Sequence, residues 1–204
     1  MSFEPIKYFN CPQCGDRLAL YFKYSKMTQC PSCKSTIFLE DEGSLKIGKE
    51  SVLTNEPSLL KLHQQIKIDN KILFTLGKLR YQYGRGFWEE WFLNDDDGRV
   101  YYLSVDEGDF VLEYPKAIKL PMENILDAKV GRRYGQFVVQ ERGFGECIGF
   151  EGELPKDVKV GQRIFYLQLS FGYGNIVTAE YANSQISTYE GKWVDAFKIE
   201  VLNG

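Results

Sequence analysis

Histidine is nearly absent from this chain of 204 residues, in which His63 is the only one. A catalytic zinc site of the histidine-rich kind is therefore not expected, because such a site takes two or three imidazole ligands. A cysteine nucleophile needs a nearby base, and Cys147 has no histidine near it in the sequence. We therefore interpret Cys147 as a small buried residue and His63 as a surface or packing residue.

Apolar runs of membrane-spanning length are also missing, since no stretch approaches the ~20 residues that a transmembrane helix needs. The opening segment, MSFEPIKYFN, has no apolar core of the kind that a signal peptide carries. We therefore expect a cytoplasmic protein. In a reducing compartment, paired cysteines are more often metal ligands than disulfides.

An excess of positive charge is lacking as well. The formal net charge is -3 and the pI is about 5.4, whereas a dedicated nucleic-acid binder relies on clustered Lys and Arg. Apolar residues make up 44% of the chain and aromatic residues 15%, which is enough for a core and suits half-buried strands. The composition therefore predicts a folded protein and disfavours nucleic acid as its partner.

Four of the five cysteines form two C-P-x-C pairs, and these are Cys11, Cys14, Cys30 and Cys33. Four thiolates are the closed, tetrahedral ligand set of a structural zinc ion. The residues between the pairs have room for a hairpin, with 17–24 running out and 27–30 returning. We predict a zinc ribbon over residues 1–40. A four-thiolate iron site is the alternative, and two disulfides would need an oxidising compartment.

A polar stretch over residues 41–58, containing Gly43, Gly48 and Pro57, is typical of a linker. Pro57 fits the first turn of a helix, so a short helix is predicted at 58–63. The remainder, 59–204, is predicted to be an all-β domain, either an antiparallel β-sandwich or paired barrels, with two small sheets at about 66–118 and 125–202. The strand-sized runs are 72–76, 79–83, 87–93, 100–103, 110–114, 137–140, 146–150, 163–169, 176–181 and 193–201.

An ordered series of motifs runs through this domain. It begins Trp88-Glu89-Glu90-Trp91-Phe92-Leu93, continues with Asp97-Gly98 and Tyr102-Leu103-Ser104-Val105-Asp106-Glu107-Gly108, and includes Glu141-Arg142-Gly143, Gly152-Glu153-Leu154-Pro155, Ala179-Glu180-Tyr181 and Tyr189-Glu190-Gly191-Lys192. Over about 60–202 the chain resembles the bacterial domain-of-unknown-function family 4178, which often has Trp where Tyr102 stands here. The resemblance implies a β-rich, non-enzymatic domain, often found beside N-terminal zinc ribbons and associated with membrane-linked stress systems.

No catalytic set emerges from the acidic residues. Glu89 and Glu90 are adjacent on a strand and so point to opposite faces. The run Asp95–Asp97 before Gly98 indicates a turn. The favoured interaction surface consists of Trp88, Glu90, Trp91 and Tyr102, because aromatic residues beside a charge are efficient recognition anchors. For the two tryptophans themselves, packing within the sheet is the favoured interpretation, because aromatic residues in strands are mostly part of the core.

These observations predict a non-enzymatic, cytoplasmic binding or adaptor protein with a protein partner. The family resemblance implies service to a membrane-linked stress system, with peripheral membrane association through that partner. Up to Glu40 the ribbon carries five basic and three acidic residues, and four thiolates with one zinc add about minus two. Nucleic-acid binding through this nearly neutral ribbon is therefore only an alternative. The other alternative is an enzyme whose carboxylates meet only in the fold, and clustered acids with raised pKa at the base of a pocket would be its sign.

Overall fold

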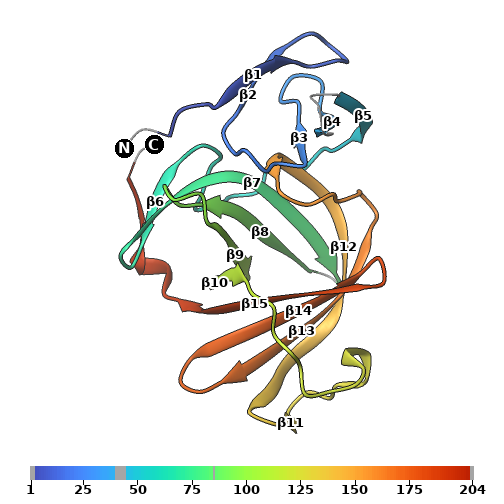
Figure 1. Ribbon diagram of the computed structural model, residues 1–204, viewed down its shortest axis with the longest axis vertical. Coiled ribbons are helices and arrows are strands. Elements are labelled where there is room, and N and C mark those ends of the chain that lie inside the picture. Colours follow the sequence, from blue (N-terminus) through green and yellow to red (C-terminus); the bar gives the residue numbers. More distant parts are fainter. Residues whose placement is uncertain (1–2, 40–44, 85, 203–204) are drawn as a thin grey trace.

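A computed structural model describes residues 3–39, 45–84 and 86–202 of the chain (Figure 1). The fold is all-β, as predicted. Within the described residues, helix is confined to two short 3-10 turns, Ile125–Asp127 and Ala196–Lys198. No helix in this part of the chain is long and apolar enough to cross a membrane.

Eight antiparallel strands close into one barrel. The two predicted halves therefore share a single sheet, which closes where β7 pairs with β12, for example at Tyr81 opposite Cys147. In order around the barrel, the strands are β7 (Lys71–Tyr83), β8 (Gly86–Asn94), β9 (Val100–Asp106), β10 (Asp109–Pro115), β15 (Gln185–Val194), β14 (Asn175–Ala182), β13 (Arg163–Phe171) and β12 (Phe137–Leu154).

Local sequence explains the hairpins. Glu107 and Gly108 both have positive φ, +47° and +97°, between β9 and β10, which is the two-residue turn that matches strand twist. Asn183 and Ser184 do the same between β14 and β15, with φ of +50° and +63°. Two such tight turns fix the register of four barrel strands.

Several predicted strand boundaries differ from the structure. The runs 72–76 and 79–83 form the single strand β7, with a bulge between Thr75 and Gly77, and 137–140 and 146–150 both belong to β12. The run 193–201 is broken by the turn Ala196–Lys198 and ends in β16 (Ile199–Val201). The helix predicted at 58–63 is absent, because His63 has a φ of +61° and its N–H donates to the carbonyl of Thr75 at 2.8 Å.

The long strands β7 and β12 extend past the barrel and carry additional strands. β6 (Gln65–Ile68) pairs with β7, and β16 pairs with β6. β3 (Met27–Gln29), β4 (Ser35–Leu39) and β5 (Leu45–Glu50) extend the sheet from β12. β5 falls within the segment predicted as a linker. The short β11 (Arg133–Tyr134) pairs with the start of β12.

The cysteine-bearing segment covers one end of the barrel (Figure 1). β1 (Lys7–Asn10) pairs with β2 (Arg17–Leu20), and β3 pairs with β4. Each cysteine pair therefore sits at the turn of its own hairpin, whereas a hairpin between the two pairs was predicted. The reason is local: Gly15 and Lys34, which directly follow the pairs, both adopt left-handed φ, +81° and +62°, and reverse the chain there.

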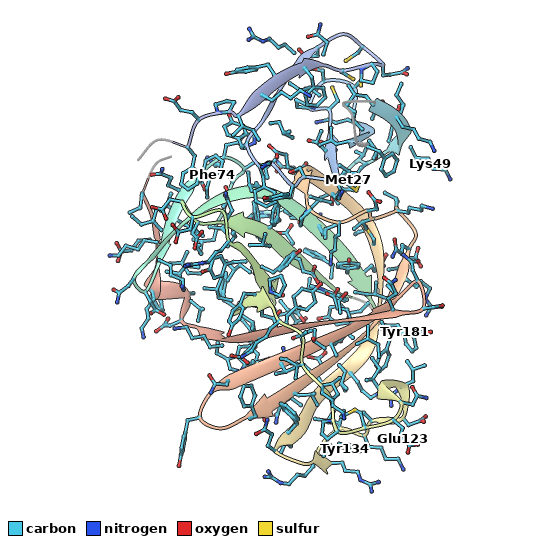
Figure 2. The ribbon with its side chains drawn as sticks, in the orientation of Figure 1. Met27, Lys49, Phe74, Glu123, Tyr134 and Tyr181 are labelled. Carbon is cyan, nitrogen blue, oxygen red and sulfur yellow. The ribbon has the colours of Figure 1, made fainter. Side chains whose placement is uncertain are left out.

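The barrel has an unusual distribution of polarity. On β8–β10 many apolar side chains face outward, and they are covered by β6, β16 and the segment around Leu60; examples are Trp91, Leu93, Leu103, Phe110 and Leu112. Toward the ribbon the interior is apolar, and Phe22 and Met27 belong to this part of the core. Figure 2 labels Met27 at this end of the barrel. The other half of the interior carries most of the polar side chains together with a few aromatic ones, and this polar half contains the cavity described below.

Candidate functional site

The sulfur atoms of Cys11, Cys14, Cys30 and Cys33 lie within 4.8 Å of one another. Cys11 Sγ is 3.8 Å from Cys33 Sγ, and Cys14 Sγ is 3.7 Å from Cys30 Sγ. A tetrahedron with metal–sulfur bonds of about 2.3 Å has edges of about 3.8 Å. The four cysteines can therefore hold one metal ion, with all four coordination positions filled by protein.

Equivalent backbone hydrogen bonds shape the two knuckles. The N–H of Gly15 donates to the carbonyl of Cys11 at 2.8 Å, and that of Lys34 donates to the carbonyl of Cys30 at 2.9 Å. These bonds bring the two sulfurs of each pair onto one turn. The geometry is that of a closed structural site, since no position is left for a substrate.

Glu153, at the end of β12, anchors the ribbon to the barrel. Its carboxylate accepts hydrogen bonds from the backbone N–H of Tyr21 at 2.7 Å, the N–H of Phe22 at 3.0 Å and Ser25 Oγ at 2.7 Å. Burial raises the pKa of Glu153, against the lowering effect of these three donors. Phe22 then packs against Phe92 of the barrel interior, with ring centres 5.3 Å apart. The ribbon thus forms part of the barrel core.

The second candidate site is a cavity of about 120 Å³ within the polar half of the barrel. Three aromatic side chains, Trp88, Tyr166 and Trp193, contribute to its wall. Six acidic side chains also line it, and these are Glu90, Asp106, Asp109, Glu113, Glu141 and Glu180. They come from five different barrel strands, so only the closed fold brings them together.

The predicted interaction residues are all buried. Trp88, Glu90 and Tyr102 face the barrel interior, with exposed fractions of 8%, 6% and 7%, and Trp88 and Glu90 line the cavity. Trp91 is 1% exposed and packs in the apolar layer outside the barrel. Trp88 Nε1 donates to Glu90 Oε1 at 3.3 Å. The two tryptophans therefore belong to different layers, and neither forms an open docking surface.

Lys156 lies beside the cavity and reaches between two of its carboxylates. Its Nζ is 3.2 Å from Glu180 and 3.7 Å from Glu90, and it lies 5.5 Å from the ring centre of Tyr102 and 5.9 Å from that of Tyr189. The Lys156 side chain is 26% exposed, while the two carboxylates are 8% and 12% exposed. Burial would lower the pKa of this amine, but Glu180 and other acidic neighbours raise it well above its usual range. Lys156 is held as an ammonium ion.

The carboxyl groups of Glu90 and Glu113 have unusually high pKa values. Burial and the neighbouring Glu180 raise the pKa of Glu90 to about 8, although Lys156 and Trp88 lower it. Burial raises the pKa of Glu113 to about 7, against a hydrogen bond from Thr178 that lowers it. Both groups change charge near neutral pH.

Two other acidic side chains of the cavity accept hydrogen bonds from tyrosines. Tyr83 Oη donates to Asp106 at 2.9 Å, and Tyr166 Oη donates to Glu141 at 2.5 Å. Burial and the hydrogen bond to Asp106 raise the pKa of Tyr83 to about 12. These phenols stay protonated and hold the carboxylates toward the cavity.

The groups best suited to covalent chemistry are in unreactive states. Burial raises the pKa of the Cys147 thiol to about 11, so the thiolate is scarce at neutral pH. His63 packs between Tyr21 and Phe74, with ring centres at 4.6 and 6.0 Å, and burial lowers its pKa. Neither residue lines the cavity.

Sequence reasoning missed Lys156 and Glu113 as site residues. Glu113 stands between Leu112 and Tyr114 in a short strand. An acidic residue in such a pattern is normally expected to point to solvent, so the pattern gave no indication of a site. On β10 the strongly apolar face, with Phe110 and Leu112, is the outer one, so the face with Asp109 and Glu113 turns inward. Glu141 and Glu180 stood in the motifs, but nothing local indicated that they would meet.

The sequence profile of a family described as "Domain of unknown function (DUF4178)" matches residues 63–196. This range contains all eight barrel strands and leaves out the cysteine-bearing segment. The match confirms the resemblance seen in the motifs. No curated protein and no solved structure shows a significant match to the chain.

Proposed function

The chain belongs to the DUF4178 family of domains of unknown function, and we propose that it is a non-enzymatic binding protein whose barrel holds a small molecule. The observation that carries this proposal is the cavity of about 120 Å³ between β8–β10 and β12–β15, which combines aromatic walls with polar groups from several strands. Small-molecule sites are typically concave, with a few placed polar groups that fix orientation. We further propose that the ion held by the four cysteines is a structural zinc, which fixes the ribbon over one end of the barrel.

Binding is favoured over catalysis because the potential nucleophiles are disabled. Cys147 is held as a thiol and Lys156 as an ammonium ion paired with Glu90 and Glu180. A lysine of raised pKa is a poor nucleophile, because its lone pair carries a proton. The tyrosines that face the acids also keep their protons.

Retention of small molecules tests this function. The zinc-loaded protein is incubated with a metabolite extract of its source cells and passed through a desalting column. It is then denatured, and the released compounds are identified by mass spectrometry. The control is Ser104→Phe, which places a large side chain in the cavity. We expect a compound that the native protein retains and the filled variant does not; equal retention by the two proteins would contradict the proposal.

A second candidate function is acid–base catalysis in the same cavity. The observation in its favour is the cluster of carboxylates in which the pKa values of Glu90 and Glu113 are raised to about 8 and about 7. Such values suit general acid–base work near neutral pH. The same incubation separates the two functions, because an enzyme depletes a compound in large molar excess over itself, whereas a binding protein retains about one molecule per chain.

An adaptor role is compatible with a filled barrel. We propose that exposed aromatic side chains of the ribbon, such as Tyr8 and Tyr24 with exposed fractions of 52% and 64%, contact a protein partner in the cytoplasm. Aromatic side chains on a rigid scaffold are efficient anchors for such contacts. We expect Tyr24→Ser to weaken capture of a partner from lysate and to leave the zinc content unchanged.

A further inference from the structure

Resting on the small-molecule binding proposed above, we propose that the ligand of the barrel cavity is a small organic ammonium ion. The cavity has no basic side chain in its lining, against six acidic ones. A site with this balance disfavours anions and attracts a cation. The remaining question is which kind of cation fits, and four features of the cavity bear on it.

The first feature is an unsatisfied carboxylate oxygen. Glu113 lines the cavity and is only 5% exposed, yet its Oε1 has no hydrogen-bond partner among the described residues. A buried polar atom of this kind carries an uncompensated desolvation cost. A donor on a bound ligand would remove that cost, and an ammonium N–H is the strongest such donor for a carboxylate.

The second feature is an ammonium site that the protein already fills with its own side chain. Lys156 Nζ lies between Glu180 and Glu90, over the rings of Tyr102 and Tyr189. The lining of the cavity repeats this combination of carboxylates and aromatic rings, since it includes Glu113, Trp88 and Trp193, but it has no lysine. Aromatic faces attract desolvated ammonium ions through their ring quadrupole.

The third feature separates an organic cation from a metal ion. Among the described residues, the four cysteines are the one group of three or more potential metal ligands whose donor atoms lie close together. The cavity carboxylates are therefore spread too widely to share a calcium or magnesium ion, which needs about six oxygen ligands at 2.0–2.6 Å. An ammonium group, in contrast, needs only one or two carboxylate acceptors, and its alkyl chain can lie against the aromatic wall.

The fourth feature is size. A cavity of about 120 Å³ is slightly smaller than the ~150 Å³ engineered cavity that accepts benzene. The cavity therefore suits an aliphatic ammonium ion of about five or six non-hydrogen atoms. n-Butylammonium is a suitable probe, and n-butanol and n-butyrate are its neutral and anionic counterparts.

The protonation of Glu113 leads to a prediction about how ligand affinity depends on pH. A cation placed against Glu113 favours its charged form, so binding at neutral pH releases a proton and tightens as the pH rises from 6 to 8. Glu113 titrates with its pKa raised to about 7 by burial. The charged and titratable groups that share this interior are Tyr81 and Tyr83 (β7), Glu90 (β8), Tyr102 and Asp106 (β9), Asp109 (β10), Glu141 and Cys147 (β12), Tyr166 (β13), Glu180 (β14), Tyr189 (β15) and Lys156.

The test is a calorimetric titration of the zinc-loaded protein with the three probes at pH 8 and low salt. We expect n-butylammonium to bind at least ten times more tightly than n-butanol, and n-butyrate not to bind. Glu113→Gln, which keeps the shape of the side chain, should weaken n-butylammonium at least tenfold. The control Glu123→Gln, on the exposed segment at the end of the molecule far from the ribbon, should change nothing (Figure 2).

Equal affinities for n-butylammonium and n-butanol, or an unchanged affinity in Glu113→Gln, would overturn the assignment of an ammonium ligand. If n-butanol alone binds, and Ser104→Phe abolishes it, the barrel is a binding site for neutral molecules and only the further inference fails. If Glu113→Gln does not fold, the number of protons released on binding is measured instead. Titrations of the native protein at pH 7 in two buffers of different ionisation enthalpy should show proton release. Absence of release overturns the inference.

Discussion

The Glu113 side chain lies directly over the bare backbone of Gly191 on the neighbouring strand, where a Cβ added to residue 191 would come within 2.6 Å of Glu113 Cγ. Gly191 belongs to the motif Tyr189-Glu190-Gly191-Lys192. The glycine thus makes room for a buried acid that faces the cavity. Gly145 does the same for Trp88, since a Cβ there would overlap the indole ring.

Gly191→Ala should therefore damage both the fold and the cavity. The added methyl group would also meet the backbone carbonyl of Leu112, which cannot move cheaply. Overpacking of this kind costs about 1–3 kcal/mol, to be measured by urea denaturation. Ser187→Ala, at an exposed position of the same strand, should stay within ~0.5 kcal/mol of the native protein. Equal stabilities of the two variants would show that Glu113 does not depend on Gly191.

Stability should fall as the pH rises through the neutral range. A carboxyl whose pKa is higher in the folded than in the unfolded protein contributes stability below its unfolded pKa and loses it as the pH passes the folded pKa. Burial raises the pKa of Glu113 to about 7 and that of Glu90 to about 8. Between pH 6.5 and 8.5 we expect the free energy of unfolding to drop by about 1–3 kcal/mol.

His63 changes the stability in the opposite direction, so that its contribution rises with pH. Its pKa in the folded protein lies below the ordinary 6.5, so this contribution changes only at the acidic side of the window. Glu113→Gln removes one of the two titrating acids and should flatten the profile, measured by urea denaturation at each pH. Parallel profiles for the variant and the native protein would mean that Glu113 is ionised throughout.

Removal of the metal should weaken the barrel as well as the ribbon. Met27 is fully buried in the barrel core, and its sulfur accepts from the N–H of Val158 at 3.2 Å. We expect chelation to leave the β-type circular dichroism spectrum at 25 °C and to lower the melting temperature by ~5–10 °C. Cys30→Ser should show the same lowered melting temperature without chelator. An unchanged melting temperature would make the ribbon an independent unit.

Glu153→Ala should loosen the junction between ribbon and barrel. The substitution leaves the buried N–H of Phe22 and the N–H of Tyr21 without their acceptor, at a combined cost of about 2–4 kcal/mol. Hydrogen exchange at these two amides should accelerate more than at barrel amides. Glu146→Ala, exposed on the same strand, is the matched control, and similar exchange in both variants would exclude Glu153 as the anchor.

The sequence predicted the parts that depend on local spacing. Two C-P-x-C pairs were sufficient to locate the cysteine cluster, and period-two runs with turn residues were sufficient for the all-β class. Hairpins such as Asp106–Asp109 follow from residues that tolerate positive φ.

The cavity could not be predicted, because it depends on which face of each strand turns inward. A strand with Trp91 and Leu93 on one face and Trp88 and Glu90 on the other is compatible with either orientation. Pattern alone assigns the apolar face to the core, and in β8–β10 that face is instead covered from outside by β6, β16 and the segment around Leu60. The pairing of β7 with β12, far apart in sequence, then encloses the acids.

The most direct test of a binding site inside the barrel is a nuclear Overhauser spectrum of the labelled protein with saturating n-butylammonium. Trp88 and Trp91 are three residues apart but lie in different layers, so each is the control for the other. We predict contacts between the ligand methylene protons and the rings of Trp88 and Tyr166, and none with Trp91. Ligand contacts with Trp91 alone, or with no barrel-interior ring, would contradict binding of the ammonium ion inside the barrel.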